Sequence, residues 1–207
     1  MAKAERRIHI IRADITNLEV DVIVNPANVS ARCGNGVDRA IFEAAGKEEL
    51  LAERKNKKPL MTRGEVFVTP SFKMAKNNVK YIFHTLSTFW INGNFKEGEI
   101  IGDCYRNCLL KAHELGCKSI AFPILGSGSF QFPIDKAFRI AHEQCCAYDR
   151  KYGDMNIFLV VYRGVAVEYC ETYFSDVKAF VSDEDVRNGI SKEYLFSDEN
   201  FESIICL

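Results

Sequence analysis

Short apolar runs alternate with longer amphipathic stretches along most of the chain. The short runs are rich in Val, Ile and aromatic residues, which is typical of strands buried in a sheet. In the longer stretches apolar residues recur every three or four positions, as on one face of a helix. The predicted strands span residues 8–11, 20–24, 65–69, 79–85, 118–123 and 157–162, and the predicted helices span 37–45, 46–60, 103–115, 134–152 and 166–181.

This alternation predicts an α/β fold with a largely parallel sheet that helices cover on both faces. The pattern also predicts a polar hairpin-like link at 70–78 and a loop at 88–98 that holds the single Trp. Ligands of such sheets bind beyond the carboxyl ends of the strands, where the connecting loops diverge. The segments at Asp14, Gly34, Gly126 and Tyr162 all follow predicted strands, so we expect them to meet at one edge.

Size and composition fit one globular domain with a short extension. The chain has 207 residues, of which 47% are hydrophobic and 27% are charged. A chain of this length can bury a substantial core. We expect the domain to span residues 1–181 and an acidic C-terminal extension, where the periodic pattern ends, to span 182–207.

The net charge and the N-terminal residues limit the expected binding partners and the expected cellular compartment. A formal net charge of -1 gives no general attraction to nucleic acid or anionic membranes, so any phosphate site must be local. No apolar run approaches a membrane span, and the first residues lack the apolar core of a signal peptide. We therefore expect a cytoplasmic protein with no membrane or nucleic-acid partner, and a monomer because the fold needs no partner.

The eight cysteines predict neither a metal centre nor a disulfide framework. Their spacing contains no Cys-x-x-Cys pair and no accompanying His cluster. Cys104 and Cys108 lie four residues apart on a predicted helix, which favours buried thiols in a reducing compartment. Cys33 lies in a glycine-rich loop, where it either contacts a ligand or only fills space.

A first glycine-rich loop joins a predicted strand to a helix in residues 24–45, VNPANVSARCGNGVDRAIFEAA. Gly34 and Gly36 allow backbone N–H groups to face a ligand closely, and Asp38 lies in the first helical turn. A helix N-terminus attracts anions because its unpaired amides and its dipole point the same way. Taken alone, this segment fits a plain structural turn equally well.

A second glycine-rich loop, LGSGSFQFP at 125–133, also lies between a strand and a helix. Pro133 is near the first helical position and Asp135 is in the first turn. One cleft between two amide-rich loops can hold a diphosphate, with an aromatic ring beside it to stack on a base. Neither loop matches the common G-x-G-x-x-G or G-x-x-x-x-G-K-[ST] phosphate motifs.

Five ordered segments together resemble a macro domain: ADIT (13–16), VNPAN (24–28), GNGVDRAIFEAAG (34–46), IFHT (82–85) and AFPILGSGSFQFP (121–133). The resemblance covers roughly residues 8–180. It implies a three-layer α/β/α sandwich with a mixed, mostly parallel six-stranded sheet. It also implies a cleft for ADP-ribose or its derivatives with no cofactor, and mono-ADP-ribosylated proteins as candidate partners.

The resemblance implies a role for each loop at the sheet edge. Asp14 would accept the adenine amine, the backbone N–H of Ile15 would lie beside it, and Tyr162 would stack on adenine. Amides of the second loop would hold the diphosphate, and Phe130 would also line the distal ribose. The implied ligand-binding residues are Asp14, Ile15, Cys33, Gly34, Asn35, Gly36, Val37, Gly126, Ser127, Gly128, Ser129, Phe130 and Tyr162.

Asn28 and Asp38 are the catalytic residues that the resemblance implies. In catalytic members an Asn and an Asp ten residues apart position the distal ribose and an attacking water. The chain therefore resembles the branch that removes ADP-ribose from acidic protein side chains or deacetylates O-acetyl-ADP-ribose. The zinc-dependent variety of the family is not supported, because its Cys and His ligands are missing.

Departures from the family pattern keep other functions open. The chain has CGNG at 33–36 where a run of glycines is usual, and GSGSFQFP where STGIYGYP is typical. A non-catalytic ADP-ribose reader is therefore an alternative, and a phosphatase for ADP-ribose-1″-phosphate would use the same pocket. Structural roles also stay open, since Asp38 stabilises a helix dipole, Asn28 can cap a turn and Tyr162 can pack in the core.

Overall fold

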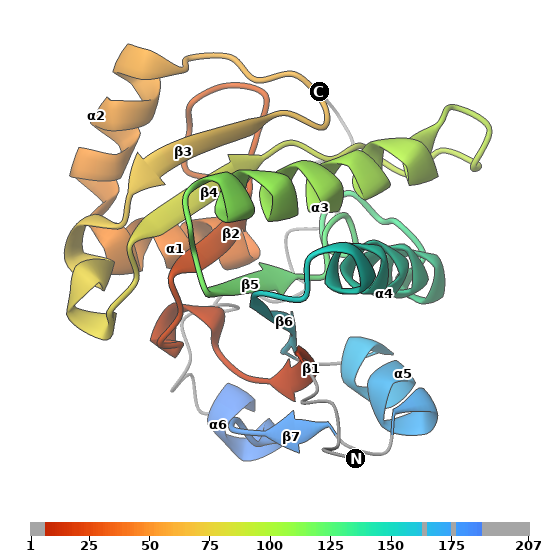
Figure 1. Cartoon of the computed structure of the whole chain (residues 1–207). Coiled ribbons are helices and arrows are strands. Elements are labelled where there is room, and N and C mark those ends of the chain that lie inside the picture. Colours follow the sequence, from red (N-terminus) through yellow and green to blue (C-terminus); the bar gives the residue numbers. More distant parts are fainter. Residues whose placement is uncertain (1–6, 163–164, 175–176, 188–207) are drawn as a thin grey trace.

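A seven-stranded sheet forms the centre of the structure, a computed structural model that describes residues 7–162, 165–174 and 177–187. The strand order is β3-β4-β2-β5-β6-β1-β7 (Figure 1). All neighbouring strands are parallel except β3 and β4, which are antiparallel. The strands are β1 (Ile8–Arg12), β2 (Val22–Pro26), β3 (Val66–Pro70), β4 (Tyr81–Thr85), β5 (Ser119–Pro123), β6 (Asn156–Val161) and β7 (Lys178–Ala179).

Helices cover both faces of this sheet, so the predicted three-layer α/β/α arrangement is confirmed. The helices are α1 (Gly36–Ala45), α2 (Lys47–Lys57), α3 (Glu97–Glu114), α4 (Ile134–Lys151), α5 (Val165–Tyr173) and α6 (Asp183–Arg187), with short 3-10 helices η1 (Ile15–Asn17) and η2 (Phe72–Asn77). Apolar residues of α1 and α2 pack on one face. Those of α3, α4 and α5 pack on the other face.

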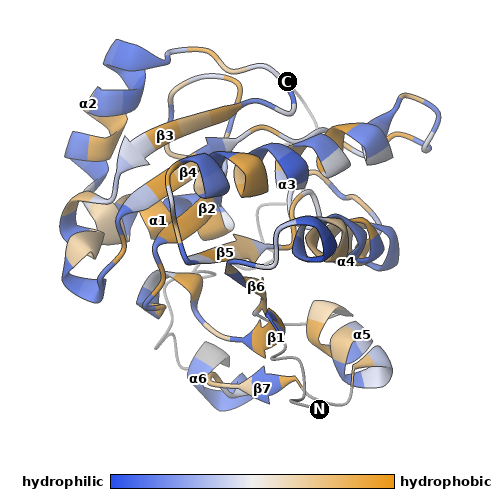
Figure 2. Ribbon diagram, in the orientation of Figure 1, coloured by the Kyte–Doolittle hydropathy of each residue, from blue (hydrophilic) through white to orange (hydrophobic). Residues whose placement is uncertain are grey.

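Alternation along the strands divides the core into these two layers. Val22 and Val24 of β2 pack with the α3 and α4 side, and Ile23 between them packs with the α1 side. This follows from the two-residue period of side chains in a strand. In Figure 2 the central strands are mostly hydrophobic in colour, while α2 is largely hydrophilic.

The last predicted helix differs from the structure. The predicted helix 166–181 ends at Tyr173, and its last part instead forms β7, which makes the sheet seven-stranded rather than six-stranded. The predicted hairpin-like link at 70–78 does join two antiparallel neighbours, β3 and β4, and it contains η2. Beyond residue 187 the predicted acidic extension lies outside the described residues.

Helix α3 also begins six residues earlier than its apolar pattern predicts, at Glu97. The Glu97 carboxylate is 1% exposed and accepts backbone N–H groups of the preceding loop, with Gly93 N at 3.0 Å and Phe95 N at 2.6 Å. Burial works against its charged form, but these hydrogen bonds lower the pKa of Glu97 to about 2. The charged carboxylate therefore fixes loop 88–96 to the start of α3.

The seven described cysteines have free thiols, and five of them are buried. Burial raises the pKa of Cys104 to about 11, so this thiol is protonated at neutral pH. Within the described ranges, no group of three or more His, Cys, Asp or Glu side chains could hold a metal ion. No helix among the described residues is long and apolar enough to cross a membrane.

Candidate active site

A cleft of about 580 Å³ lies at the carboxyl ends of β2, β5 and β6. Both glycine-rich loops contribute to its walls, as their positions after strands predict. Eleven of the predicted site residues line it: Asn28, Asn35, Gly36, Val37, Asp38, Gly126, Ser127, Gly128, Ser129, Phe130 and Tyr162.

One wall of the cleft is the N-terminus of α1. Asn35 is the N-cap residue, but its side chain makes no capping hydrogen bond. Its Oδ1 instead accepts from Arg39 Nη2 at 3.2 Å. The first amides of a helix have no partner within the helix, so those of Gly36 and Val37 are available to an anion in the cleft.

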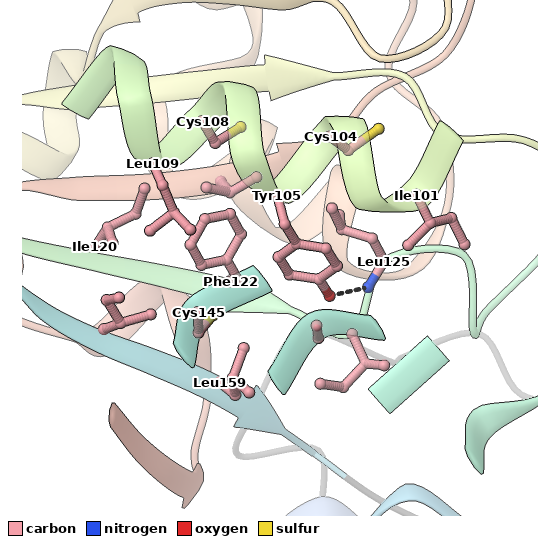
Figure 3. Close-up of a cluster of buried hydrophobic side chains, with 14 of the residues drawn as sticks. Ile101, Cys104, Tyr105, Cys108, Leu109, Ile120, Phe122, Leu125, Cys145 and Leu159 are labelled. Atoms are coloured by element: carbon pink, nitrogen blue, oxygen red, sulfur yellow. Dashed lines mark hydrogen bonds between the residues drawn. The ribbon is translucent and has the colours of Figure 1, made fainter. Parts of the chain in front are cut away.

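The opposite wall is loop 126–132, and the buried side chain of Tyr105 holds its start. Tyr105 Oη donates to Pro123 O at 3.1 Å. It also accepts from Leu125 N at 2.9 Å, the hydrogen bond that Figure 3 shows. Gly126 has a φ of +82°, and a Cβ there would lie 2.8 Å from Ile101 Cδ1. Only glycine satisfies both the backbone conformation and this close packing.

Three amides of this loop are available to a ligand. Ser127 N and Phe132 N donate to Ile124 O and Gly126 O within the loop. In the described part of the chain, the amides of Gly128, Ser129 and Phe130 donate to no backbone or side-chain acceptor. Successive free amides form a concave anion site, and this loop and the N-terminus of α1 line the same cleft.

Phe130 forms the rim of the cleft with the loop that Glu97 fixes. Its ring lies 4.1 Å from that of Phe89, measured between centroids, and its carbonyl accepts from Trp90 N at 2.9 Å. Phe89 is 54% exposed. The rim is therefore an aromatic pair in which Phe130 lines the cleft and Phe89 belongs to the loop that Glu97 holds.

Asp38 is the most buried acidic group of the cleft wall, with 3% of its surface exposed. Its Oδ1 accepts from Asn25 Nδ2 at 2.7 Å, and its Oδ2 accepts from Gly34 N at 2.5 Å and Asn28 Nδ2 at 3.5 Å. Burial raises the pKa of Asp38 to about 6. Hydrogen bonds from Asn25 and Gly34 lower this pKa, as do the charges of Arg54 and Arg32, but burial has the larger effect. A carboxylate with this pKa is a suitable proton acceptor near neutral pH.

A chain of buried polar groups holds Asn25 behind Asp38. Asn25 Nδ2 also lies 3.1 Å from His84 Nδ1, and His84 Nε2 lies 3.1 Å from Thr69 Oγ1. Because Asn25 Nδ2 is a donor, Nδ1 of His84 accepts and its proton is on Nε2. Burial and then the charge of Arg54 hold the pKa of His84 well below its usual range, so the imidazole is neutral.

The cleft lining does not include four of the predicted ligand-binding residues, Asp14, Ile15, Cys33 and Gly34. Asp14 Oδ1 accepts from Thr16 N at 2.9 Å as the N-cap of η1, and Ile15 is fully buried. Gly34 contributes through its amide to Asp38. Roles for these residues in ligand binding remain predictions.

Burial and then the nearby charge of Asp38 raise the pKa of the Cys33 thiol. Cys33 is therefore protonated at neutral pH, which does not suit a nucleophile. Tyr162 does line the cleft, and its carbonyl accepts from Arg12 Nε at 3.1 Å. Arg12, which is 7% exposed, also pairs with Asp183 at the start of α6.

Sequence reasoning missed the residues that act from behind the cleft. Asn25 lies in the motif VNPAN, on a buried strand. Nothing in the local sequence indicates that its side chain donates a hydrogen bond to Asp38, 13 residues further along the chain. Tyr105 reads as an ordinary apolar member of its helix. His84 has no exposed surface, and both of its ring nitrogens have hydrogen-bond partners in the core.

The fold and the cleft place the chain among open α/β domains whose ligand site lies at the carboxyl ends of the strands, here lined by two amide-rich segments that suit phosphate groups. Residues 24–141 match the family model described as Macro domain. A macro domain-containing protein of Chlorobaculum tepidum is 42% identical over 134 residues, which are 65% of this chain and 75% of that protein. A protein named O-acetyl-ADP-ribose deacetylase from Salmonella typhimurium is 36% identical over 149 residues, 71% of this chain and 82% of that protein. The chain belongs to the macro domain family.

Solved structures agree with this assignment. A mutant Oceanobacillus iheyensis macrodomain with bound ADPR has a TM-score of 0.71 and 30% identity, over 81% of this chain and 93% of that chain. A Trypanosoma brucei macrodomain in complex with ADP-ribose has a TM-score of 0.70 and 27% identity, over 81% of this chain and 68% of that chain. The resemblance deduced from the sequence motifs is thereby confirmed.

Proposed function

We propose that this protein binds ADP-ribose in the cleft and hydrolyses esters of its distal ribose. The substrates would be O-acetyl-ADP-ribose or ADP-ribose on acidic protein side chains. The observation that carries the proposal is Asp38, a buried carboxylate in the cleft wall whose pKa burial raises to about 6. A buried negative charge is electrostatically unfavourable beside a dianionic ligand, so its place in the cleft wall favours a catalytic role over binding alone.

Binding would use the two amide-rich walls. The diphosphate would lie between the N-terminus of α1 and the amides of Gly128, Ser129 and Phe130, which have the polarity that an anion requires. Tyr162 would stack on the adenine, and the rim formed by Phe89 and Phe130 would contact the distal ribose. Mono-ADP-ribosylated proteins are the proposed partners.

Hydrolysis would use Asp38 as the proton acceptor. Water attacks the ester carbonyl carbon, and one water proton passes to Asp38. That proton then passes to the ribose oxygen as the carbon–oxygen bond breaks, which leaves a free carboxylic acid and ADP-ribose. Asn28, 3.5 Å from Asp38 Oδ2 through its Nδ2, would hold a ribose hydroxyl and so fix the ester near the water.

Single-turnover experiments test this proposal. The full-length protein in excess is mixed with O-acetyl-ADP-ribose or with a glutamate-modified protein, and acetate or free ADP-ribose is followed in time. Release from either substrate well above the rate without protein supports the hydrolase. Tight binding of ADP-ribose in calorimetry without any release would favour a non-catalytic reader. Release of phosphate from ADP-ribose-1″-phosphate, with no release from the two esters, would favour a phosphatase. Absence of ADP-ribose binding would refute the proposal.

The rate of hydrolysis should depend on pH through Asp38. Its ionised form is the proton acceptor, so the rate should be near its plateau above pH 7. It should be half of the plateau near pH 6 and fall about tenfold for each further pH unit. Calorimetry at the same pH values is the control, because the diphosphate stays charged and ADP-ribose affinity should change little. A rate that is constant from pH 5 to about 8 would contradict a role for the Asp38 proton.

A further inference from the structure

Arg54 is a charged side chain in the core beneath the cleft, and neither ligand binding nor the proposed chemistry uses it directly. It has no exposed surface and has the largest volume among the fully buried described side chains. Leu50, one turn earlier, is also fully buried, so this is the inward face of an otherwise polar helix α2. A guanidinium in such a place normally pairs with a carboxylate.

The guanidinium lacks the contacts that would explain its burial by stability alone. Within the described part of the chain, none of its three nitrogen atoms has a hydrogen-bond partner. Burying a charge without such partners is costly, and an apolar side chain of similar length is often as stable or more stable. Burial lowers the pKa of Arg54, but an arginine still keeps its proton in a protein.

Helix α2 packs against α1 and β3, and these two elements carry or contact two groups of the polar chain behind the cleft that the buried charge of Arg54 can influence. The first is the carboxylate of Asp38, on the neighbouring helix α1, against which α2 packs. The second is the imidazole of His84, whose ring contacts those of Phe42 on α1 and Phe67 on β3. A buried positive charge stabilises the negative form of the first group and the neutral form of the second.

Both effects favour the arrangement that the structure shows. A neutral His84 accepts one N–H of Asn25 at Nδ1, so the other N–H of the same amide points to Asp38 Oδ1. An ionised Asp38 accepts from Asn25, Gly34 and Asn28 together, which a protonated carboxyl group could do only in part.

We propose that Arg54 is a positioning residue whose buried positive charge keeps Asp38 ionised and keeps His84 in the neutral form that orients Asn25. The role in turnover rests on the proposed function. The effect on Asp38 ionisation does not, because it is a property of the folded protein without substrate. The two can therefore be tested separately.

Other groups around Asp38 must be compared with Arg54. Asn25 from β2 and Gly34 from the loop are neutral donors, and Cys33 is a neutral thiol. Arg32 is a second positive charge, but it is exposed and its Nη2 contacts Asn28 Oδ1 at 3.3 Å. Water and salt screen an exposed charge far more than a buried one. Arg32→Met is therefore a matched control for Arg54→Met.

Carbon NMR of aspartate carboxyl groups in the full-length, ligand-free protein measures the ionisation of Asp38. The Asp38 signal is assigned by its loss in Asp38→Ala. We expect Arg54→Met to raise the Asp38 titration midpoint by about one pH unit. Arg54→Lys keeps a positive charge, so its midpoint should stay close to that of wild type. Arg32→Met should change the midpoint by less than about 0.3 units. Arg54→Gln is a second neutral variant that gives the same readout if Arg54→Met does not fold.

Turnover of the same variants then tests the functional part. The acidic limb of the rate profile should move with the NMR midpoint, so the rate of Arg54→Met at pH 6 should fall several-fold while its plateau at pH 8 changes little. A shifted midpoint in a protein without hydrolase activity would refute the proposed function and leave the charge effect standing. An unchanged midpoint in both neutral variants, or equal shifts in Arg54→Met and Arg32→Met, would overturn the inference.

Discussion

Replacing Asp38 by Ala should lower the single-turnover rate about 100- to 10,000-fold, which is the usual contribution of a positioned general base. ADP-ribose affinity should stay within a few-fold of wild type. The free amides of Gly128, Ser129 and Phe130 belong to the opposite wall and do not depend on Asp38. Rapid-mixing release assays and calorimetry on the same preparation measure both quantities.

Asp135→Ala is the matched control for this variant. Asp135 also lies in the first turn of a helix, α4, but it is exposed and does not line the cleft. If Asp38 only stabilises the dipole of α1, the two variants should both lose a little stability and keep their rates. A rate loss confined to Asp38→Ala would support the proton acceptor, and equal rates in all three proteins would contradict it.

Replacing Gly34 by Ala should lower the rate about 100-fold, because it adds a methyl group between the two proposed catalytic side chains. A Cβ at residue 34 would lie 2.6 Å from Asn28 Nδ2 and 2.8 Å from Asp38 Oδ2. Both atoms are at the ends of side chains, so the fold can adjust, but the adjustment moves the groups that chemistry needs. Misplacement by about 1 Å can cost 100-fold in rate.

Gly98→Ala is the corresponding control in helix α3, at a residue that does not line the cleft. A Cβ at residue 98 would have an ordinary contact of 3.5 Å with Ile140 Cδ1, and alanine favours the helical state over glycine. We expect wild-type turnover and equal or higher thermal stability for Gly98→Ala. Gly34→Ala with wild-type turnover would show that the spacing of Asn28 and Asp38 does not limit the rate.

Local sequence patterns predicted the strands and helices that carry the site, because the periodicity of these elements depends on residues that are close together in the sequence. The loop after β5 and helix α1 lie where the sequence places them, while β2 begins and ends two residues later than predicted, at Val22 and Pro26. The start of α3 was missed because a carboxylate at Glu97 holds the loop, and hydrogen bonds to loop amides leave no periodic pattern. Strand β7 was missed because its two residues are defined by pairing with β1.

The electrostatic setting of Asp38 could not be predicted in the same way. In the sequence, Arg54 stands beside the charged run 55–58 and looks like a residue of the same solvated surface. In the structure, Arg54 is fully buried while Lys55 and Lys57 are exposed. Only the packing of α2 on α1 decides which charge of this segment faces inward.

The ion pair between Arg12 and Asp183 determines where the C-terminal boundary of a shorter fragment should be placed. We propose that residues 182–207 extend beyond the macro domain, yet Asp183 contacts a buried side chain whose Nε holds the carbonyl of Tyr162 in the cleft wall. Truncation after residue 181 would remove that carboxylate and leave the Arg12 guanidinium unpaired there. A fragment meant for ligand soaking or binding assays should therefore be expressed through residue 187, the end of α6.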